Sequence, residues 1–573
     1  MNLRFARKLL ILYPLLMLLC GIGYAKYDNY QIDGDAIAFM DIADAIHVHN
    51  WPVVVNGYWN PGYAAALAVG QVIAHPTRWN ELQTYCYVNF FVFLCAIVAC
   101  LFFVQGLVRL RSIANPGGDD TAALSPTALM LASLGLLFFS FQRELSLGKV
   151  RSDALLLVWF FLAAGLLLRL QTKARFSTWP LLGAVLGFAY LTKSFAFLPS
   201  GFLLLALLIY GITRKSVSRR TITLGSITAG IVFAVIAAPY IHSISKQAGH
   251  LTTGESARMN YCFFIDHTPR WHEWHHHDLG HAVGAFKHPE IVLSDNPNVY
   301  SYANHAVGTY PLWFDPSYYT AGLKPHIWLK GHTQRIARCA ALLLRFFLEH
   351  PESFVFFLAL LGMGAIVRRS SSEWRFWIPV LGWGVLMFAI YFPIDLQDRY
   401  LTGAFLLVVL PILAALRKPA TGYAGQAATA AAVLLALLAL ADATRDIASR
   451  RREESVAGYP RGSYSLQVFP AAKGLAELGV LPGDKVVCMG DEACYVDQYW
   501  ARLSGTQILD EVEVPHSGNP AAFWSDGDNA QRIVSTLAPQ PVKAIVAVLP
   551  VSASQPAGWK QLGASNYYAY LLH

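Results

Sequence analysis

Four carboxylates stand close together directly after the first apolar segment of the chain. They lie in QIDGDAIAFMDIADAI, residues 31–46, as Asp33, Asp35, Asp41 and Asp44. A carboxylate at a membrane surface can act as a general base that takes the proton of an acceptor hydroxyl. A second carboxylate can orient that acceptor or bind a hard divalent cation, which prefers oxygen ligands. We predict Asp35 as the base, because it adjoins the helix expected to follow, and Asp33 as the alternative base.

Structural roles compete with this chemistry. Asp35 could cap that helix by accepting backbone N–H groups, which would account for one of the carboxylates. Asp41 and Asp44 are three residues apart and share a helix face, where we expect a solvated surface. The sequence requires no metal, and Mg²⁺ or Mn²⁺ at Asp33 and Asp35 stays an open alternative.

Cationic side chains gather in a second short segment, QRELSLGKVRSD at residues 142–153. It contains Lys149, Arg151 and the carboxylate of Asp153, which opens a hydrophobic helix and therefore either caps that helix or serves a site. Lysine and arginine at this density favour an anionic phosphate ligand. Contact with lipid headgroups is the alternative.

Two further cations belong to other loops. Lys193 lies in AYLTKSFAFLPSG and Arg399 lies in DLQDRY, each beside an apolar segment. Arg399 offers a forked, permanently charged group to phosphate. The alternatives are snorkelling of Lys193 along an apolar surface and a salt bridge from Arg399 to Asp395 or Asp398. With the two cations above, they are our candidates for binding a phosphate.

Aromatic residues are concentrated in GTYPLWFDPSYYTAG, residues 308–322, and in YWNPGY, residues 58–63. They could bind sugar rings or form an aromatic belt at the membrane interface, and both interpretations are open. The candidates for contact with a sugar or an acceptor are Trp59, Tyr63, Tyr310, Trp313, Asp315 and Tyr318.

A histidine-rich stretch, RWHEWHHHDLGH at residues 270–281, offers ligands for a transition metal. The candidate ligands are His272, His276, His277 and His281. Their spacing matches no strict ligand motif such as HExxH. Contacts with sugar hydroxyls, ring stacking or solvation explain the stretch as well, so metal binding is the minority interpretation.

The composition places these residues in a membrane protein. Of the 573 residues, 55% are hydrophobic and 14% are charged, whereas soluble domains carry about 25% charged residues. The net charge of +8 is spread over short loops, which argues against nucleic-acid binding. Apolar segments long enough to cross a bilayer recur. We predict about eleven transmembrane helices, at residues 8–25, 85–108, 125–142, 153–170, 179–193, 195–213, 223–243, 351–367, 376–393, 401–417 and 428–443.

The basic loops predict the orientation of these helices, because lysine and arginine stay cytoplasmic in short loops. The clusters that include Arg7, Arg109, Arg169, Arg214 and Arg368 all fall on one side of this topology. The N-terminus is then cytoplasmic, the C-terminus is external, and the first segment is an uncleaved anchor rather than a signal peptide. The carboxylates and cations described above fall on the external face.

Three external segments are too long for simple turns: residues 26–84, residues 244–350 and the tail from 444. We expect helices at the membrane interface after Asp35, at Tyr63–Ala74 and at His332–Phe347.

In the tail, apolar strands alternate with helices, which predicts a small α/β domain with a partly parallel sheet. The strands are 485–489 and 544–549, and the helices are 471–478 and 529–537. The chain therefore divides into a transmembrane domain, 1–443, with external loops 26–84 and 244–350, and an external α/β domain, 444–573.

Two of the eight cysteines, Cys488 and Cys494, lie in this external tail. A disulfide is permitted there, and a disulfide and two free thiols are equally open. Cys262 and Cys339 form a second conceivable pair with less support.

Taken in order, several of these motifs resemble the GT-C superfamily of polytopic glycosyltransferases, including aminoarabinose lipid A transferases and protein O-mannosyltransferases. The resemblance covers roughly residues 1–450 and lies in IDGDAIAFMDIADAI, YWNPGYAAAL, KVRSDALLL, GFAYLTKSFAFLPSG and DRYLTGAFLLVVLP. The tail and the loop 244–350 look unlike the better-known members. The implied fold is an α-helical polytopic membrane protein with external juxtamembrane helices and, in this chain, a small C-terminal α/β domain.

The resemblance implies a sugar donor carried on a polyprenyl phosphate and a catalytic carboxylate in the Asp33–Asp35 motif. It implies a second acidic position at Asp153. We expect an inverting transfer of the sugar to a hydroxyl of a glycan, lipid or protein acceptor at the external, periplasmic face of a bacterial inner membrane. No cofactor is required, and a divalent cation stays open.

Two other classes of function compete with this enzyme. A transporter or flippase of lipid-linked glycans would need ionisable residues within its spans, and the predicted spans have almost none. A non-enzymatic envelope assembly protein would tolerate neutralisation of Asp35, Asp153 and Arg399.

Overall fold

The computed structural model describes most of the chain: residues 3–28, 32–114, 122–172, 175–213, 219–269, 279–285, 291–302, 307–315, 317–349, 351–362, 366–367, 371–417, 424–457, 466–515, 518–550 and 555–572. It separates into two compact units. The helical unit comprises Met1–Asp28, Cys86–Gly254 and Leu329–Arg452. The mixed unit comprises Asn29–Tyr85, Glu255–Trp328 and Glu453–His573.

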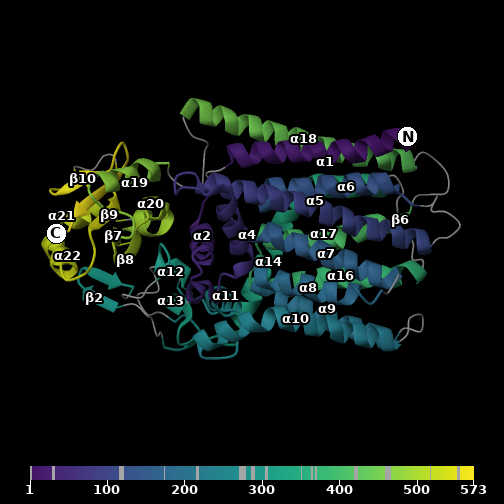
Figure 1. Cartoon of the computed structure of the whole chain (residues 1–573), viewed down its shortest axis with the longest axis horizontal. Helices are drawn as coiled ribbons and strands as arrows, with labels where there is room; N and C mark the ends of the chain where they lie inside the picture. Colours follow the sequence, from purple (N-terminus) through teal and green to yellow (C-terminus); the bar gives the residue numbers. More distant parts are fainter. Residues whose placement is uncertain are drawn as a thin grey trace. The chain divides into compact units, whose positions relative to one another are not determined.

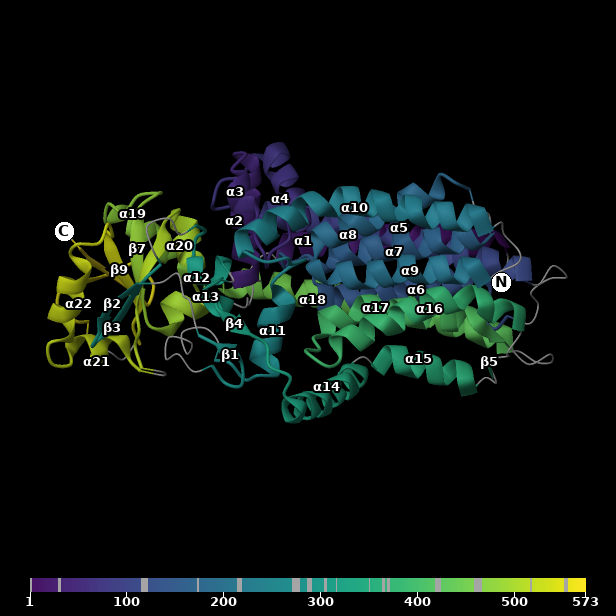
Figure 2. The same cartoon turned by 90° about the horizontal axis from the view of Figure 1, so that it is seen from below.

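Long apolar helices that run side by side make up the helical unit (Figures 1 and 2). They are α1 (Leu3–Tyr27), α5 (Glu81–Ala114), α6 (Pro126–Ser140) with the π-helix η1 (Phe141–Leu145), α7 (Asp153–Thr172), α8 (Thr178–Thr192), the short η2 (Ser194–Ala196), α9 (Phe197–Thr213), α10 (Arg219–Ala248), α14 (Leu329–Glu349), α15 (Pro351–Gly362), α16 (Ser371–Tyr391), α17 (Asp398–Ala415) and α18 (Ala424–Ala457). The strands β5 (Ile366–Val367) and β6 (Leu416–Arg417) form a two-stranded ladder.

Close packing holds these helices together, since lipid provides no hydrophobic drive between them. Gly183 of α8 shows the requirement, because a Cβ there would lie 2.2 Å from the carbonyl oxygen of Ala229 on α10. Among the described residues, 7 helices are long and apolar enough to cross a membrane. Three shorter apolar helices of this unit, Thr178–Thr192, Ser194–Ile209 and Trp377–Tyr391, accompany them. The chain is therefore an integral membrane protein.

Each predicted span overlaps a helix of this unit. At the eighth predicted span, residues 351–367, that helix is α15, which ends at Gly362. The helical nature of these segments is thus confirmed, whereas the number of crossings and their orientation stay predictions. The expected helix at His332–Phe347 is α14, and its exposed apolar side chains include Leu344 and Leu348.

Short helices and one sheet build the mixed unit. The helices are α2 (Gly34–His47), α3 (Trp51–Val54), α4 (Pro61–Ala74), α11 (Ser256–Phe264), α12 (Pro311–Phe314), α13 (Ser317–Thr320), α19 (Val468–Glu477), the π-helix η4 (Glu492–Val496), α20 (Tyr499–Ser504), α21 (Pro520–Ser525) and α22 (Asn529–Leu537). The helices expected after Asp35 and at Tyr63–Ala74 are α2 and α4. Proline at the first position of α4, α12 and α21 suits a helix start, where its missing N–H has no intrahelical partner.

The sheet of the mixed unit has 7 strands in the order β10-β11-β9-β7-β8-β3-β2. Their bounds are β2 (Ile291–Asp295), β3 (Asn298–Ser301), β7 (Lys485–Met489), β8 (Gln507–Val512), β9 (Ala544–Val548), β10 (Trp559–Gln561) and β11 (Tyr567–Leu571). The strands β1 (Val283–Gly284) and β4 (Leu323–Lys324) pair separately. β7 is parallel to β8 and β9, and the outer pairs are antiparallel, so the expected partly parallel sheet is confirmed.

Strand β3 comes from the loop 244–350, yet it pairs with β8 through the register Tyr300↔Glu511. Sequence alone predicted β7, β9 and two helices of this fold but did not predict that strands from another segment would join the sheet. Residues of α21 and α22, including Trp524 and Ile533, pack with Val487 of β7 in one apolar cluster. The division into domains at residue 443 stays a prediction.

Asp510 of β8 is fully buried in this sheet, and burial raises the pKa of its carboxyl to about 6, against smaller opposing effects of Ser301 and Lys485. The folded value exceeds the unfolded value of roughly 3.9. The contribution of this carboxyl to the free energy of unfolding is therefore fully present below about pH 4 and is lost as the pH rises through 6.

We expect Asp510→Asn to stabilise the protein by about 2–3 kcal/mol at pH 7.5, with the gain vanishing near pH 4. Thermal unfolding measured across this pH range tests it, with the exposed Asp528→Asn as the matched control. An equal effect at both pH values would contradict the assignment of the titration to Asp510.

Candidate active site

The start of α2 separates the roles of the two candidate bases. Asp33 is the N-cap residue, and its Oδ1 accepts the backbone N–H of Ala36 at 3.0 Å. The capping role considered for Asp35 thus belongs to Asp33. Asp35 lies in the first turn and accepts a hydrogen bond from the indole Nε1 of Trp313, at 3.3 Å to Oδ1. This geometry supports Asp35 as the preferred base, and its catalytic role stays a prediction.

Gly34 lets the indole of Trp313 approach the helix start. A Cβ at position 34 would lie 2.6 Å from the ring, so any larger residue would displace the tryptophan. Trp313 is half-buried, and its carbonyl oxygen accepts the indole N–H of Trp59 at 3.3 Å. Glycine at this position therefore permits the contact between Trp313 and Asp35.

The expected solvated face of α2 is wrong, because Asp41 and Asp44 bind the guanidinium of Arg502 from α20. Arg502 Nη1 lies 2.6 Å from Asp41 Oδ1 and 3.2 Å from Asp44 Oδ2, and Arg502 Nε lies 2.8 Å from Glu81 Oε1. The Arg502 side chain is only 1% exposed. This cluster, here called the Arg502 cluster, ties α2 and the start of α5 to α20. A periodicity argument could not find it, because Arg502 is 461 residues from Asp41.

The electrostatics of this cluster follow from burial and charge. Burial raises the pKa of Asp41, partly opposed by Arg502 and Thr309. Burial also acts to raise the pKa of Asp44, but the charges of Arg502 and Arg78 outweigh burial and lower that pKa. Burial acts to lower the pKa of Arg502, but its three carboxylate partners hold that pKa well above its usual value.

Most of the aromatic candidates are packing residues in the mixed unit. Tyr63 is fully buried, Tyr310 donates to Glu511 Oε2 at 3.1 Å, and Tyr318 donates to the carbonyl oxygen of Tyr302 at 2.7 Å. Trp59 is also buried. These four side chains are buried in the conformation described, and their contact with a sugar or an acceptor stays a prediction.

Of the same set, only Trp313 and Asp315 are half-buried. Asp315 Oδ1 accepts the backbone N–H of Ser317 at 2.8 Å.

In the helical unit, a second cluster forms at the start of α7. Lys193 Nζ lies 2.6 Å from Asp153 Oδ1, and Arg399 Nη1 lies 3.9 Å from Asp153 Oδ2. Lys193 also lies 4.0 Å from the ring centroid of Tyr400. Asp153 is 6% exposed, so its charge is compensated by the two cations rather than by solvent. The structure thus brings together three predicted site residues from three separate loops.

Beneath these charges lies a small cavity of about 20 Å³ with mainly apolar walls. It is lined by Asp153, Arg399 and Tyr400 together with apolar side chains such as Leu156 and Phe160. The ring of Tyr391 stacks on Tyr400 at 4.9 Å and on Phe195 at 3.8 Å. This volume is enough for about one water molecule, so the cavity as described does not itself accommodate a lipid phosphate.

A chain of polar contacts positions Arg399. Arg335 of α14 pairs with Asp395, whose Oδ2 accepts the amide of Gln397 at 3.0 Å. Gln397 Oε1 in turn accepts the Nε–H of Arg399 at 2.9 Å. Asp395 is therefore paired with Arg335, and Arg399 approaches Asp153. The alternative salt bridge from Arg399 to Asp395 or Asp398 stays open.

Lys149 and Arg151 lie on the segment before α7 and are half-buried. The amide of Asn89 on α5 donates to the carbonyl oxygens of Leu147 and Lys149, at 3.0 and 2.8 Å. Arg151 interacts electrostatically with Asp153, and the phosphate role of Lys149 and Arg151 stays a prediction.

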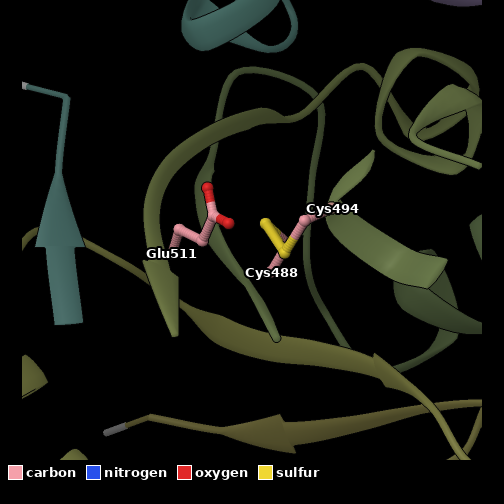
Figure 3. A group of neighbouring side chains, drawn as sticks. All are labelled: Cys488, Cys494 and Glu511. Atoms are coloured by element: carbon pink, nitrogen blue, oxygen red, sulfur yellow. A yellow bond between two sulfur atoms is a disulfide. The ribbon is translucent and has the colours of Figure 1, made fainter. Parts of the chain in front are cut away.

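One group of three potential metal ligands occurs among the described residues: Cys488, Cys494 and Glu511 (Figure 3). Cys488 and Cys494 form a disulfide, which resolves the open alternative in favour of the bond. Their sulfurs are not available as thiolate ligands in this state. Cys262 and Cys339 are free thiols, so the second conceivable pair is wrong.

The histidine candidates are only partly within the described residues. His272, His276 and His277 lie outside them, whereas His281 is exposed and stacks on Trp328 at 3.7 Å between ring centroids. No described metal-ligand group includes His281, Asp33 or Asp35. A divalent cation at the two aspartates stays an open alternative.

Similarity to known proteins is confined to solved structures. No family model and no curated protein matches the chain. Solved structures do match: an oligosaccharyltransferase from Archaeoglobus fulgidus, tethered to an acceptor peptide containing the NVT sequon, has a TM-score of 0.44 and 13% identity over 93% of this chain and 68% of that chain. ArnT from Cupriavidus metallidurans in the apo state has a TM-score of 0.42 and 13% identity over 99% of this chain and 98% of that chain. The same protein bound to undecaprenyl phosphate has a TM-score of 0.41 and 12% identity over 98% of this chain and 97% of that chain.

The TM-scores of these matches range from 0.41 to 0.44. Identities of 12–13% leave the chemistry to be argued from the side chains of this chain.

Sequence analysis missed several residues that position the candidate site. Arg502, Arg335, Asn89 and Glu511 each lie far along the chain from the group they hold. The available signal was weak: Asn89 and Arg502 are polar residues in largely apolar stretches, whereas Arg335 and Glu511 stand among other polar residues. Such a residue indicates a buried partner but does not reveal which one.

Proposed function

We propose that the protein is an inverting glycosyltransferase that moves a sugar from a polyprenyl-phosphate donor to an acceptor hydroxyl at the external face of the membrane. The observation that carries the proposal is the cluster of Asp153, Lys193 and Arg399 at the ends of apolar helices. Two cations there can bind a phosphate headgroup while the lipid chain follows the apolar helices. The resemblance of the motifs to GT-C enzymes agrees with it.

The proposed reaction is a single displacement at the anomeric carbon. The acceptor oxygen forms a bond to that carbon while its proton passes to Asp35. The bond from the anomeric carbon to the phosphate oxygen breaks, and polyprenyl phosphate leaves with the electron pair. Lys193 and Arg399 stabilise the negative charge that develops on the leaving phosphate. Inversion follows from attack opposite the leaving group.

Asp153 has an orienting role in this proposal. It holds the ammonium of Lys193 and the guanidinium of Arg399 near each other, and it balances their charge before the donor binds. A bound phosphate would then compete with Asp153 for the same donors. The acceptor is a glycan, lipid or protein hydroxyl, and the setting is a bacterial inner membrane.

The test is sugar transfer by the purified protein in proteoliposomes that contain a panel of polyprenyl-phosphate sugars and mixed envelope acceptors. We expect sugar transfer with release of polyprenyl phosphate from at least one donor, and no sugar transfer from nucleotide sugars. Absence of turnover with every donor, together with movement of lipid-linked glycan across the bilayer, would instead support a flippase. Absence of both activities would favour the assembly protein.

Lys193→Met is expected to raise the donor KM about tenfold, because one of the two cations is lost. Binding of free polyprenyl phosphate should weaken by a similar factor. The matched control is Lys560→Met, an exposed lysine of β10 in the mixed unit. Unchanged KM and unchanged binding would remove the Asp153 cluster from the donor site.

A further inference from the structure

Residues 308–314, here called the bridging segment, connect α2 to the C-terminal part of the sheet within the mixed unit. On one side, Ile508 N donates to Thr309 O and Gln507 Nε2 donates to Gly308 O, both at 3.0 Å. On the other side, Thr309 donates its backbone N–H and its hydroxyl to Asp41, at 2.7 and 2.8 Å. The segment therefore fixes α2 relative to strand β8.

The bridging segment is also held at α12, which carries Trp313. Tyr310, at the N-cap of α12, donates to Glu511 on β8, and Glu511 also accepts the hydroxyl of Tyr302. Asn56 donates its side-chain amide to the carbonyl oxygen of Phe314 at 2.7 Å. These contacts hold both ends of α12 in place. They therefore fix the backbone at Trp313 and limit the directions that its side chain can take.

The indole ring has its own support from the C-terminal part of the unit. Tyr495 of η4 lies against it, with ring centroids 5.6 Å apart. The neighbouring Cys494 is joined by the disulfide to Cys488 at the end of β7, beside Glu511 (Figure 3). Trp313 is therefore supported from the carboxyl ends of the neighbouring strands β7 and β8, through Glu511 on β8 and through Tyr495 in η4, which follows β7.

We propose that Trp313 is a positioning residue for Asp35. In this proposal the C-terminal α/β part of the mixed unit helps to hold the indole of Trp313 against Asp35. The indole N–H fixes Asp35 Oδ1, and the ring covers Gly34 so that the carboxylate keeps one direction at the start of α2. This inference rests on the proposed function, because a base that transfers a proton needs defined geometry. It gives the tail a role in the reaction without direct contact with the substrate.

Trp313→Phe removes the N–H donor and keeps most of the ring. We expect kcat to fall roughly 10–100-fold, since misplacement of a catalytic group by about 1 Å has an effect of that size. The donor KM should stay within about twofold, because the phosphate cations are unaffected. The matched control is Trp524→Phe, in the apolar core of the same unit, which should retain activity. Loss of activity in both variants would indicate a packing effect and overturn the proposal.

Gly34→Ala tests the same contact from the other side. Alanine favours a helix more than glycine does, yet its Cβ would displace the indole. We expect kcat to fall although α2 is not weakened. Undiminished kcat in this variant would contradict the positioning role, even if Trp313→Phe failed to fold.

A spectroscopic readout separates this inference from the proposed function. The indole ¹⁵N–¹H resonance of Trp313 is assigned in nanodiscs by its loss in Trp313→Phe. It should shift in Asp35→Asn, because the acceptor changes from a carboxylate to an amide. An inactive wild type with this shift would defeat the proposed function alone. An active wild type without the shift would defeat the positioning role alone.

Discussion

Replacing Asp35 by asparagine is expected to lower kcat for sugar transfer by roughly 10²–10⁴-fold, the usual contribution of a positioned general base. Asparagine has nearly the same shape, and its Oδ1 can still accept the indole N–H of Trp313. It cannot take up the proton of the acceptor hydroxyl. The donor KM should change little, because the residues proposed to bind the phosphate, Lys193 and Arg399, are unchanged in this variant. Release of polyprenyl phosphate in proteoliposomes, measured in single turnover, gives both quantities.

Asp33→Asn is the matched control for this variant. Asparagine caps helices about as well as aspartate, so the hydrogen bond to Ala36 can be kept. We expect its kcat to stay within about threefold of wild type. A loss in Asp33→Asn with activity retained in Asp35→Asn would move the base to Asp33. Activity retained in both variants would remove this motif from the reaction.

The parts of the structure that could be predicted from the sequence follow from local rules. Apolar length identified the segments that form α5, α7 and α17, because a helix must satisfy its own backbone groups in lipid. Alternating apolar strands and helices identified β7 and β9 in the tail. The order of acidic and basic motifs indicated which loops are candidates for the chemistry.

What could not be predicted depends on contacts between distant segments. Lys193 and Arg399 were both candidates for phosphate, but their convergence on Asp153 depends on how three helices pack. The solvated-face interpretation of Asp41 and Asp44 failed because no local pattern reveals Arg502. The partner of the aromatic candidate Tyr310 was hidden for the same reason, since Tyr310 and Glu511 meet only in the folded protein. A charged or aromatic residue in a largely apolar chain indicates that a partner exists, but the identity of that partner is known only from the folded structure.

Arg502→Met is expected to destabilise the mixed unit by about 3–5 kcal/mol, the usual effect of removing one partner from a buried ion cluster. The substitution keeps apolar volume but leaves the carboxylates of Asp41, Asp44 and Glu81 without the guanidinium that lies within 2.6–3.2 Å of them. Arg78, which lies 2.7 Å from Asp44, compensates only part of this charge. Thermal unfolding followed by near-ultraviolet circular dichroism, with limited proteolysis, measures the loss.

The pH dependence distinguishes this electrostatic origin from lost packing. Arg502 and Arg78 lower the pKa of Asp44 against the opposing effect of burial. Its contribution to stability is therefore present above the unfolded pKa of roughly 3.9 and is lost as the pH falls through the lower folded value. In Arg502→Met, protonation relieves the uncompensated carboxylates, so the deficit relative to wild type should shrink between pH 7.5 and about pH 4. The exposed Arg532→Met serves as the control and should cost less than about 0.5 kcal/mol. A deficit that is constant with pH would mean that Arg502 acts by filling space, and α2 would then owe its position to the bridging segment alone.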